Sequence, residues 1–175
     1  MKKFDRRSFL KASSLSAAAI ASTSLLANCV SPKTTSKGIY MGGFAAPKIP
    51  NLRAAFIGVG ARGGDHLRVV ASMENTEVVA ISDLHEDHVE RWSQIASDIG
   101  KGERHQNVVT YYGDENLWKK MLDDVKPDVV FIATNWENHA PMVIQAMKSG
   151  AHAFVEVPIA TTLEDMWEIV RTSEE

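Results

Sequence analysis

The chain has 175 residues, of which 45% are hydrophobic and 23% charged, a composition typical of an ordinary soluble globular protein, and the length favours a single domain. Its formal net charge is −3, and because the first 28 residues carry five basic side chains against one acidic one, the rest of the chain is acidic. An acidic body argues against a nucleic-acid partner, and a single cysteine, Cys29, excludes an intrachain disulfide and a cysteine-rich metal site.

Residues 1–29 are predicted to be an export signal rather than part of the fold. Residues 5–11, Asp-Arg-Arg-Ser-Phe-Leu-Lys, resemble the twin-arginine signal, and the mildly apolar stretch that follows is too short for a stable membrane span. The alternative is a basic amphipathic helix at the surface. Because the twin-arginine route carries folded proteins, often with a cofactor already bound, it suits a protein that is loaded with a nucleotide before export.

The end of this signal suggests a membrane tether. Residues 26–29, Leu-Ala-Asn-Cys, resemble a lipobox, whose cysteine is acylated after cleavage, although Asn28 stands where a small residue is usual. The alternative is an incidental Cys29 near an ordinary cleavage site. We therefore expect a periplasmic protein or a membrane-anchored lipoprotein with its globular domain in water. Residues 30–52, rich in Ser, Thr, Gly and Pro, are predicted to form a largely irregular linker.

The most informative stretch covers residues 53–64. An apolar run at residues 54–57 predicts a buried strand, which leads directly into Gly58-x-Gly60-x-x-Gly63 and then into a helical pattern. Strand, glycine turn and helix form the context that a dinucleotide-binding fingerprint requires. Gly58 permits the tight turn, Gly60 lets the backbone approach a pyrophosphate, and Gly63 lets the helix pack against the strand. The start of the helix would present free N–H groups to the phosphates.

A carboxylate follows at the spacing that this fingerprint predicts. Residues 76–82 indicate a second strand, and Asp83 ends it 25 residues after Gly58, close to the roughly 20 expected for a ribose-binding acid. Such an acid accepts both ribose hydroxyls and repels a 2′-phosphate, so NAD is favoured over NADP. Asp83 could also be the N-cap of the helix that begins near Leu84. Arg62, inside the glycine loop, could reach a phosphate or remain a solvated surface side chain.

Strands and helices alternate through the rest of the chain. Further strands are predicted at residues 108–112, 128–133 and 151–157, and helices at roughly 85–99, 117–125 and 140–147. A last helix opens at Thr162, with Asp165 in the capping-box position. Its predicted core face consists of Leu163, Met166, Trp167 and Val170. This pattern predicts an α/β fold in residues 53–175, a doubly wound parallel sheet of the Rossmann kind. The chain ends within a helical pattern, so we expect a second, substrate-binding domain to be absent from it.

Two more features lie where the predicted strands end. In the loop at residues 134–139, which opens with Thr134, Trp136 could pack on a ribose or nicotinamide face and His139 could face the pocket or cap the helix; either could equally be core packing. His85 and His88 are three residues apart, but no third ligand accompanies them, so no metal site is predicted. The other histidines of the body, His66, His105 and His152, are expected at the surface or in local hydrogen bonds. No residue is predicted to be catalytic.

Taken together, the glycine loop, Asp83, residues 134–139 and Glu156-Val157-Pro158 resemble the Gfo/Idh/MocA oxidoreductases. In most of that family the fifth strand ends in Glu-Lys-Pro, and the lysine shuttles a proton beside the nicotinamide; Val157 cannot do so. Residues 41–48, the Gly-Val-Gly-Ala-Arg-Gly loop, Trp136 with His139, and Glu-Val-Pro are similar to glycoside hydrolase family 109, over about residues 40–175. The predicted cofactor-binding residues are Gly58, Gly60, Arg62, Gly63, Asp83, Thr134, Trp136, His139, Glu156 and Val157.

The resemblance implies an unusual hydrolysis of small α-N-acetylgalactosaminides. Tightly held NAD oxidises the sugar 3-hydroxyl to a ketone, which acidifies the proton on C2; the aglycone is eliminated, water adds, and the hydride returns. The family's acid/base and sugar-binding residues lie in a second domain beyond Glu175, so none is assigned here. Two alternatives stay open: a sugar dehydrogenase of the wider family, or an inactive fragment that binds NAD. The isolated 175-residue chain is expected not to hydrolyse any α-N-acetylgalactosaminide.

Overall fold

The computed structural model describes residues 41–101 and 103–175. The predictions for the export signal, for Cys29 and for the first part of the linker therefore lie outside the described residues. Met41–Gly43 form one turn of 3₁₀ helix, η1, and residues 44–51 lead into the first strand without a regular element. Among the helices described, none is both long enough and apolar enough to cross a bilayer.

The centre of the fold is a sheet of five parallel strands in the order β3-β2-β1-β4-β5. The strands are β1 (Leu52–Ile57), β2 (Thr76–Asp83), β3 (Val109–Tyr112), β4 (Val129–Ile132) and β5 (His152–Val155). Strand order reverses beside β1, so the chain winds first outward through β2 and β3 and then through β4 and β5 on the other side. This is the predicted doubly wound α/β fold, and in such sheets ligands bind where the order reverses, beyond the carboxyl ends of the strands.

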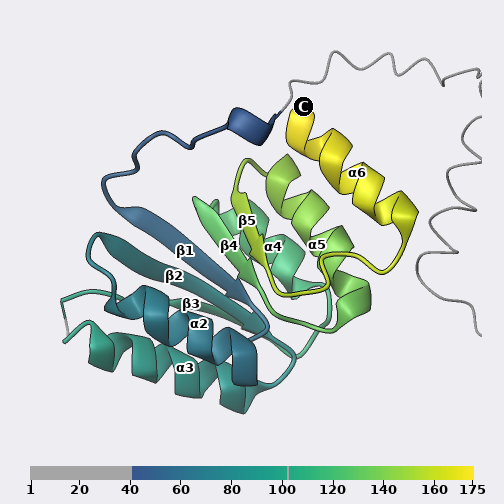
Figure 1. Cartoon of the computed structure of the whole chain (residues 1–175). Helices are drawn as coiled ribbons and strands as arrows, with labels where there is room; N and C mark the ends of the chain where they lie inside the picture. Colours follow the sequence, from purple (N-terminus) through teal and green to yellow (C-terminus); the bar gives the residue numbers. More distant parts are fainter. Residues whose placement is uncertain (1–40, 102) are drawn as a thin grey trace, which may run out of the picture. The chain divides into compact units, whose positions relative to one another are not determined.

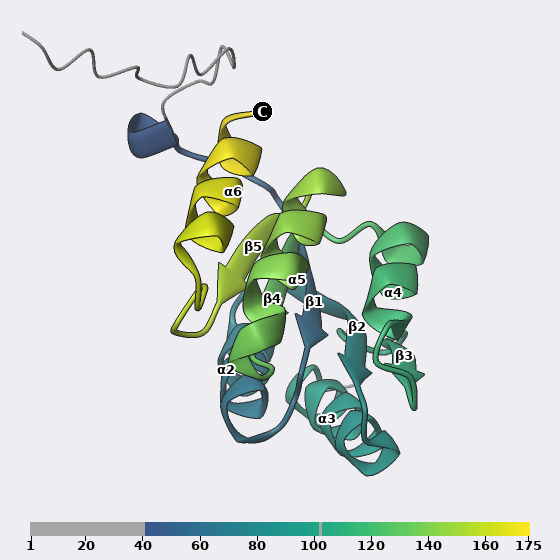
Figure 2. The same ribbon diagram turned by 90° about the vertical axis from the view of Figure 1, so that its right-hand side faces the viewer.

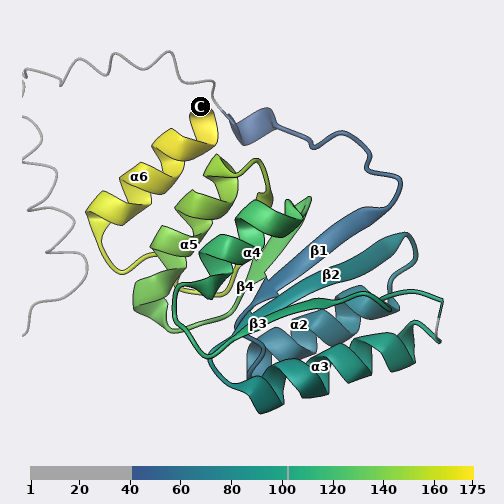
Figure 3. The ribbon, with the colours of Figure 1, turned by 180° about the vertical axis from the view of Figure 1, so that it is seen from behind.

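Helices cover both faces of the sheet, as Figures 1 and 3 show from opposite sides. One face carries α2 (Ala61–Ser72) and α3 (Glu86–Ile99), and the other carries α4 (Leu117–Val125) and α5 (Trp136–Lys148). The last helix, α6 (Leu163–Glu174), lies against α5 rather than over the centre of the sheet (Figure 2). The predicted alternation of strands and helices is thus confirmed element by element.

Two apolar layers hold these elements together, one on each side of the sheet. Ala55 and Ile57 of β1 face α4 and α5, whereas Ala54 and Phe56 of the same strand face α2 and α3. This alternation is why the strands are continuously apolar: each side chain of a two-sided sheet is buried on one face or the other. The predicted inner face of α3 is confirmed, since Val89, Trp92 and Ala96 are buried.

The predicted core face of α6 is wrong. Its large apolar side chains are exposed to solvent by 70% at Leu163, 44% at Met166, 56% at Trp167 and 42% at Val170. The helix instead rests on the core through Ile169 and buries Thr172. Because α4 and α5 already cover this face of the sheet, α6 reaches only the outside of α5, and its apolar stripe points away. Its start is as predicted: Thr162 Oγ1 accepts a hydrogen bond from the Asp165 N–H at 3.1 Å.

His105 is more deeply placed than the sequence suggests. Its ring is 1% exposed, Nδ1 accepts from the Val78 N–H at 3.0 Å, and Nε2 lies 3.0 Å from the Ala71 carbonyl. Because Nδ1 must accept, Nε2 carries the proton and donates to that carbonyl. The ring therefore joins the end of α2 to β2 and serves the fold.

Candidate cofactor site

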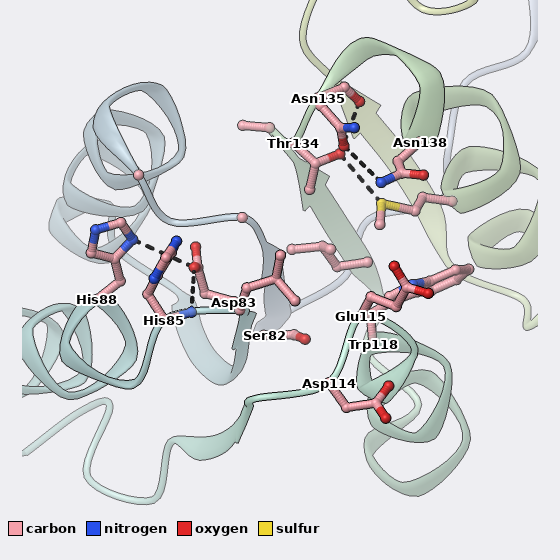
Figure 4. A pocket seen from close by; sticks show the side chains of 16 residues that line it. Ser82, Asp83, His85, His88, Asp114, Glu115, Trp118, Thr134, Asn135 and Asn138 are labelled. Carbon is pink, nitrogen blue, oxygen red and sulfur yellow. Dashed lines mark hydrogen bonds and ion pairs between the residues drawn. The ribbon is translucent and has the colours of Figure 1, made fainter.

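A pocket of about 420 Å³ opens at the carboxyl edge of the sheet, where the strand order reverses. Of the predicted residues, Gly58, Gly60, Asp83 and Thr134 line it (Figure 4). A smaller hollow of about 140 Å³ shares Thr134 with this pocket. It is lined by five more of the predicted residues, Arg62, Trp136, His139, Glu156 and Val157. Nine of the ten predicted residues therefore border two cavities that share Thr134, and the tenth, Gly63, is buried in the first turn of α2.

The glycine loop has the shape that close approach of a ligand requires. Gly58 adopts φ +80°, and a Cβ there would lie 2.7 Å from the Ala133 carbonyl oxygen. A Cβ on Gly63 would lie only 1.8 Å from the Gly58 carbonyl oxygen, so α2 can start this close to the strand only with a glycine there. A Cβ on Gly60 would meet nothing within 4 Å, so the space in front of it is open. These three positions fit a loop that cradles a pyrophosphate.

Asp83 is fixed at the end of β2 by two backbone amides. Its Oδ2 accepts from the Val59 N–H at 2.7 Å, and its Oδ1 accepts from the His85 N–H at 3.0 Å. The N-cap alternative is wrong, because His85 occupies the N-cap position of α3. The carboxylate instead ties the glycine loop to the end of β2. A carboxylate offers about four acceptor positions, so this one keeps capacity for the hydroxyls of a ribose.

Glu156, just after β5, contacts two basic side chains of α2. Arg62 donates to Glu156 Oε1 through Nε at 3.2 Å and through a terminal guanidinium nitrogen at 2.9 Å, and His66 Nε2 lies 2.7 Å from the same oxygen. The His66 hydrogen bond, with the Val157 N–H and Arg62, holds the pKa of Glu156 below its usual range. Arg62 is therefore not a surface side chain without partners, because its guanidinium connects α2 to the end of β5. His66, expected to be ordinary, belongs to this cluster.

His139 joins the two loops that border the smaller hollow. Its ring is 1% exposed, Nδ1 lies 2.8 Å from the Pro158 carbonyl oxygen, and Nε2 lies 3.1 Å from the Thr134 carbonyl oxygen. The His139 side chain is therefore part of the wall of the hollow and is almost completely shielded from solvent. Trp136, by contrast, begins α5 and is 60% exposed, which leaves its ring available to a ligand and excludes core packing. Val157 is 80% exposed.

The comparisons with known proteins agree with this geometry. The family model described as "Oxidoreductase family, NAD-binding Rossmann fold", that of the Gfo/Idh/MocA proteins, matches residues 52–175. The chain belongs to the Gfo/Idh/MocA oxidoreductase family. Residues 52–175 form an NAD-binding Rossmann domain, whose cofactor is NAD.

Several similar curated proteins carry glycosidase names. Glycosyl hydrolase family 109 protein 1 of Akkermansia muciniphila is 41% identical over 153 residues, which cover 85% of this chain and 31% of that protein. The alpha-N-acetylgalactosaminidase of Shewanella oneidensis is 39% identical over 178 residues, covering 99% of this chain and 38% of that protein. The chain thus spans about a third of the length of these relatives.

Solved structures of the Gfo/Idh/MocA type share the fold. The myo-inositol dehydrogenase of Lactobacillus casei, in complex with NAD(H) and myo-inositol, superposes with a TM-score of 0.56 at 29% sequence identity. The match covers 70% of this chain and 33% of that one. An enzyme solved with the same cofactor therefore has the same arrangement of strands and helices.

Several residues of this Gfo/Idh/MocA site were missed by the sequence reasoning. Asp114 and Glu115, in the loop after β3, and Trp118 of α4 line the larger pocket, as do Asn138 and Met142 of α5. Asp114, Glu115 and Trp118 could be found only once β3 is known to lie beside β2, whereas Asn138 and Met142 follow from the position of α5 directly after β4. The metal prediction is not contradicted: within residues 41–101 and 103–175, no three His, Cys, Asp or Glu side chains gather as a metal site would need.

Proposed function

We propose that this chain is the NAD-binding part of an exported glycosidase that hydrolyses α-N-acetylgalactosaminides. The observation that supports it most is the similarity, along nearly the whole chain, to proteins named glycosyl hydrolase family 109, one of them an alpha-N-acetylgalactosaminidase. Val157 supports it too, because it leaves the end of β5 without the proton-carrying lysine of an ordinary dehydrogenase of this family.

In this proposal each of the two cavities binds one half of the cofactor. The glycine loop and the N-terminal turn of α2 receive the pyrophosphate, and Asp83 accepts the hydroxyls of the adenosine ribose. The smaller hollow, bordered by Trp136, His139 and Glu156, receives the nicotinamide half. Bound NAD supplies a reversible hydride acceptor for C3 of the sugar. The residues of this chain bind and orient the cofactor, whereas sugar recognition and proton transfer belong to a second domain.

Export and tethering belong to the same proposal. The twin-arginine-like residues 5–11 suit a protein whose nucleotide is bound before it leaves the cytoplasm, and acylation of Cys29 would hold it at a membrane. The partner is then a small glycoside outside the cytoplasm, not a nucleic acid. Cell fractionation tests this: a variant with Arg6→Lys and Arg7→Lys should stay in the cytoplasm, and export of that variant would contradict the proposal.

A chimera tests the glycosidase assignment. Residues 52–175 replace the matching segment of the Shewanella oneidensis enzyme, and the readout is p-nitrophenol released from p-nitrophenyl α-N-acetylgalactosaminide. We expect many turnovers per NAD without accumulation of NADH, and no turnover by the 175-residue chain alone. The Asp83→Ala chimera is the matched control and should require added NAD. A folded chimera that holds NAD but releases no p-nitrophenol would contradict the assignment.

A sugar dehydrogenase is the second candidate, favoured by the structural likeness to an inositol dehydrogenase. It predicts stoichiometric formation of NADH from a free sugar, whereas the glycosidase predicts none. The same chimera distinguishes the two when absorbance at the NADH band is followed alongside p-nitrophenol.

A further inference from the structure

The outer edge of β5 is an unprotected strand edge. The N–H groups of His152 and Glu156 donate toward β4, to carbonyl oxygens at 2.9 Å and 3.0 Å. Because successive residues of a strand direct their backbone groups to opposite sides, those of Ala153 and Val155 face away from β4. Among the described residues, no strand lies on that side. Soluble proteins usually protect such an edge with lysine, proline or a covering segment, and β5 contains neither lysine nor proline.

A row of three phenylalanine rings crosses one face of the sheet and stops at this edge. Phe56 of β1, Phe131 of β4 and Phe154 of β5 are partners in the strand register. The centroids of neighbouring rings lie 5.0 Å apart in both pairs. Phe56 is completely buried, whereas Phe154 is 50% exposed. An apolar side chain on a further strand would therefore continue the row and bury Phe154.

On the other face of the sheet, α6 extends beyond this edge. α5 covers β4 and β5, and α6 packs against the outside of α5, at the β5 side of the sheet (Figures 1 and 2). Packed helices lie about 8–10 Å apart and neighbouring strands about 4.8 Å apart, so α6 lies about two strand spacings further out than α5. The described strands end before they reach it. Its apolar stripe, formed by Leu163, Met166, Trp167 and Val170, stays exposed.

We propose that the outer edge of β5 and the apolar stripe of α6 bind a sixth parallel strand with apolar side chains on both faces. Doubly wound sheets of the order 3-2-1-4-5-6 have a strand in this place, and a right-handed connection through α6 leads the chain to it. The strand belongs to a longer polypeptide, since this chain spans about a third of the length of its relatives. The inference rests on the proposed function, in which a second domain completes the enzyme.

A second copy of the chain fits this edge less well. Two β5 edges related by a two-fold axis would pair antiparallel, with the two strands about 4.8 Å apart. Both α6 helices would then lie over the same junction, although each helix is about 10 Å wide. A single strand avoids this crowding, because one helix is enough to cover it.

The sixth strand also determines where the second domain enters. Parallel strands end at the same edge of a sheet, so this strand ends on the side where Glu156 and Val157 border the smaller hollow. The polypeptide that follows the strand therefore starts next to the hollow assigned to the nicotinamide half. Sugar recognition and proton transfer are required at this place, and the described chain leaves Val157 there 80% exposed.

The first test uses the 175-residue chain as it exists. Amide hydrogen exchange followed by NMR should show the His152 and Glu156 N–H groups protected by their bonds toward β4. The Ala153 and Val155 N–H groups should exchange at least about 100-fold faster. Sedimentation should show a monomer, both for the native chain and for Trp167→Glu.

The second test supplies the strand through the chimera with the Shewanella oneidensis enzyme. Hydrogen exchange of β5 should slow at least about 100-fold relative to the 175-residue chain. Trp167→Glu should lower the melting temperature of the chimera by at least about 5 °C, because it places a carboxylate in a buried apolar contact. Val69→Glu is the matched control: Val69 of α2 is 55% exposed, close to the 56% of Trp167, and this variant should melt with the unsubstituted chimera. Neither substitution should change the melting temperature of the 175-residue chain.

Each other outcome overturns the inference. A native chain that dimerises, with the dimer lost in Trp167→Glu, would assign the edge to a second copy. Protected Ala153 and Val155 N–H groups in a monomer would mean that the chain covers its own edge. A chimera that does not fold, or that Trp167→Glu leaves unchanged, would mean that no strand binds there. A chimera in which the strand binds and NAD is held, but which releases no p-nitrophenol, would instead contradict the proposed function and leave this inference intact.

Discussion

Gly60 and Gly63 belong to one motif, but the structure gives them different physical roles. An added Cβ at Gly63 would overlap the Gly58 carbonyl oxygen, whereas one at Gly60 would enter empty space. We expect Gly63→Ala to lower the free energy of unfolding by about 2–3 kcal/mol, the usual cost of overpacking. Gly60→Ala should stay within about 0.5 kcal/mol of the native chain. It should nevertheless weaken NAD binding at least about tenfold, since the methyl group occupies the space of the pyrophosphate.

Urea unfolding and NAD titration of both variants check this pair. Gly60→Ala that binds NAD as the native chain does would show that the open space in front of Gly60 is not the pyrophosphate site. If the Gly63→Ala variant is as stable as the native chain, then α2 does not start as close to the end of β1 as the structure shows.

The Glu156 carboxylate makes stability depend on pH in a definite direction. Its pKa is lowered in the folded chain, first by His66, then by the Val157 N–H and Arg62. The contribution of Glu156 to the stability of the fold is therefore complete above its ordinary pKa of 4.5. It is lost as the pH falls through the lower pKa that Glu156 has in the folded chain. We expect Glu156→Gln to melt below the native chain at pH 6, and the gap to narrow progressively below pH 4.5.

Thermal melting between pH 8 and pH 3 measures this gap. Glu74→Gln, at an exposed position, is the matched control and should melt with the native chain throughout. A gap for Glu156→Gln that stays constant down to pH 3 would contradict the assigned carboxylate cluster.

At the residue scale, the sequence predicted which side chains border the site better than it predicted their contacts. The glycine spacing and Asp83 belong to a local pattern that follows from strand, turn and helix, so they were found directly. The Arg62–Glu156 contact joins residues 94 positions apart. Neither spacing nor composition carries such a pairing, because it depends on β4 lying between β1 and β5.

At the scale of elements, α6 tests how far periodicity can be trusted. The stripe of Leu163, Met166, Trp167 and Val170 is a genuine helical pattern, and the helix forms where it predicts. Periodicity identifies an apolar face but not the element that covers it, and here the stripe is exposed. The other helices were predicted correctly because each has a sheet face to cover.

Two tryptophan variants check the placement of α6. Trp167 is 56% exposed and Trp118 is 7% exposed. We expect Trp167→Ser to change the free energy of unfolding by no more than about 0.5 kcal/mol, and Trp118→Ala to lower it by about 3–5 kcal/mol. Urea unfolding of the two variants gives both values. A loss of more than about 2 kcal/mol for Trp167→Ser would mean that α6 turns its apolar stripe toward the core.

At the scale of the whole molecule, strand order assembles the site. The reversal beside β1 brings the ends of β1, β2 and β4 to one pocket and adds the loop after β3, with Asp114 and Glu115, to its rim. Alternating strands and helices predicted a parallel sheet, but not which strands are neighbours. That is why the acids of this rim escaped the sequence reasoning while the glycine loop did not.

The most direct test of the NAD site is the cofactor content of the chain. The purified protein is incubated with NAD, freed of unbound nucleotide and denatured, and NAD in the supernatant is assayed enzymatically. We predict close to one NAD per chain, since a single Rossmann fingerprint forms a single dinucleotide site. No NAD from a chain whose circular dichroism shows the α/β fold would contradict the assignment of the two cavities as its binding site.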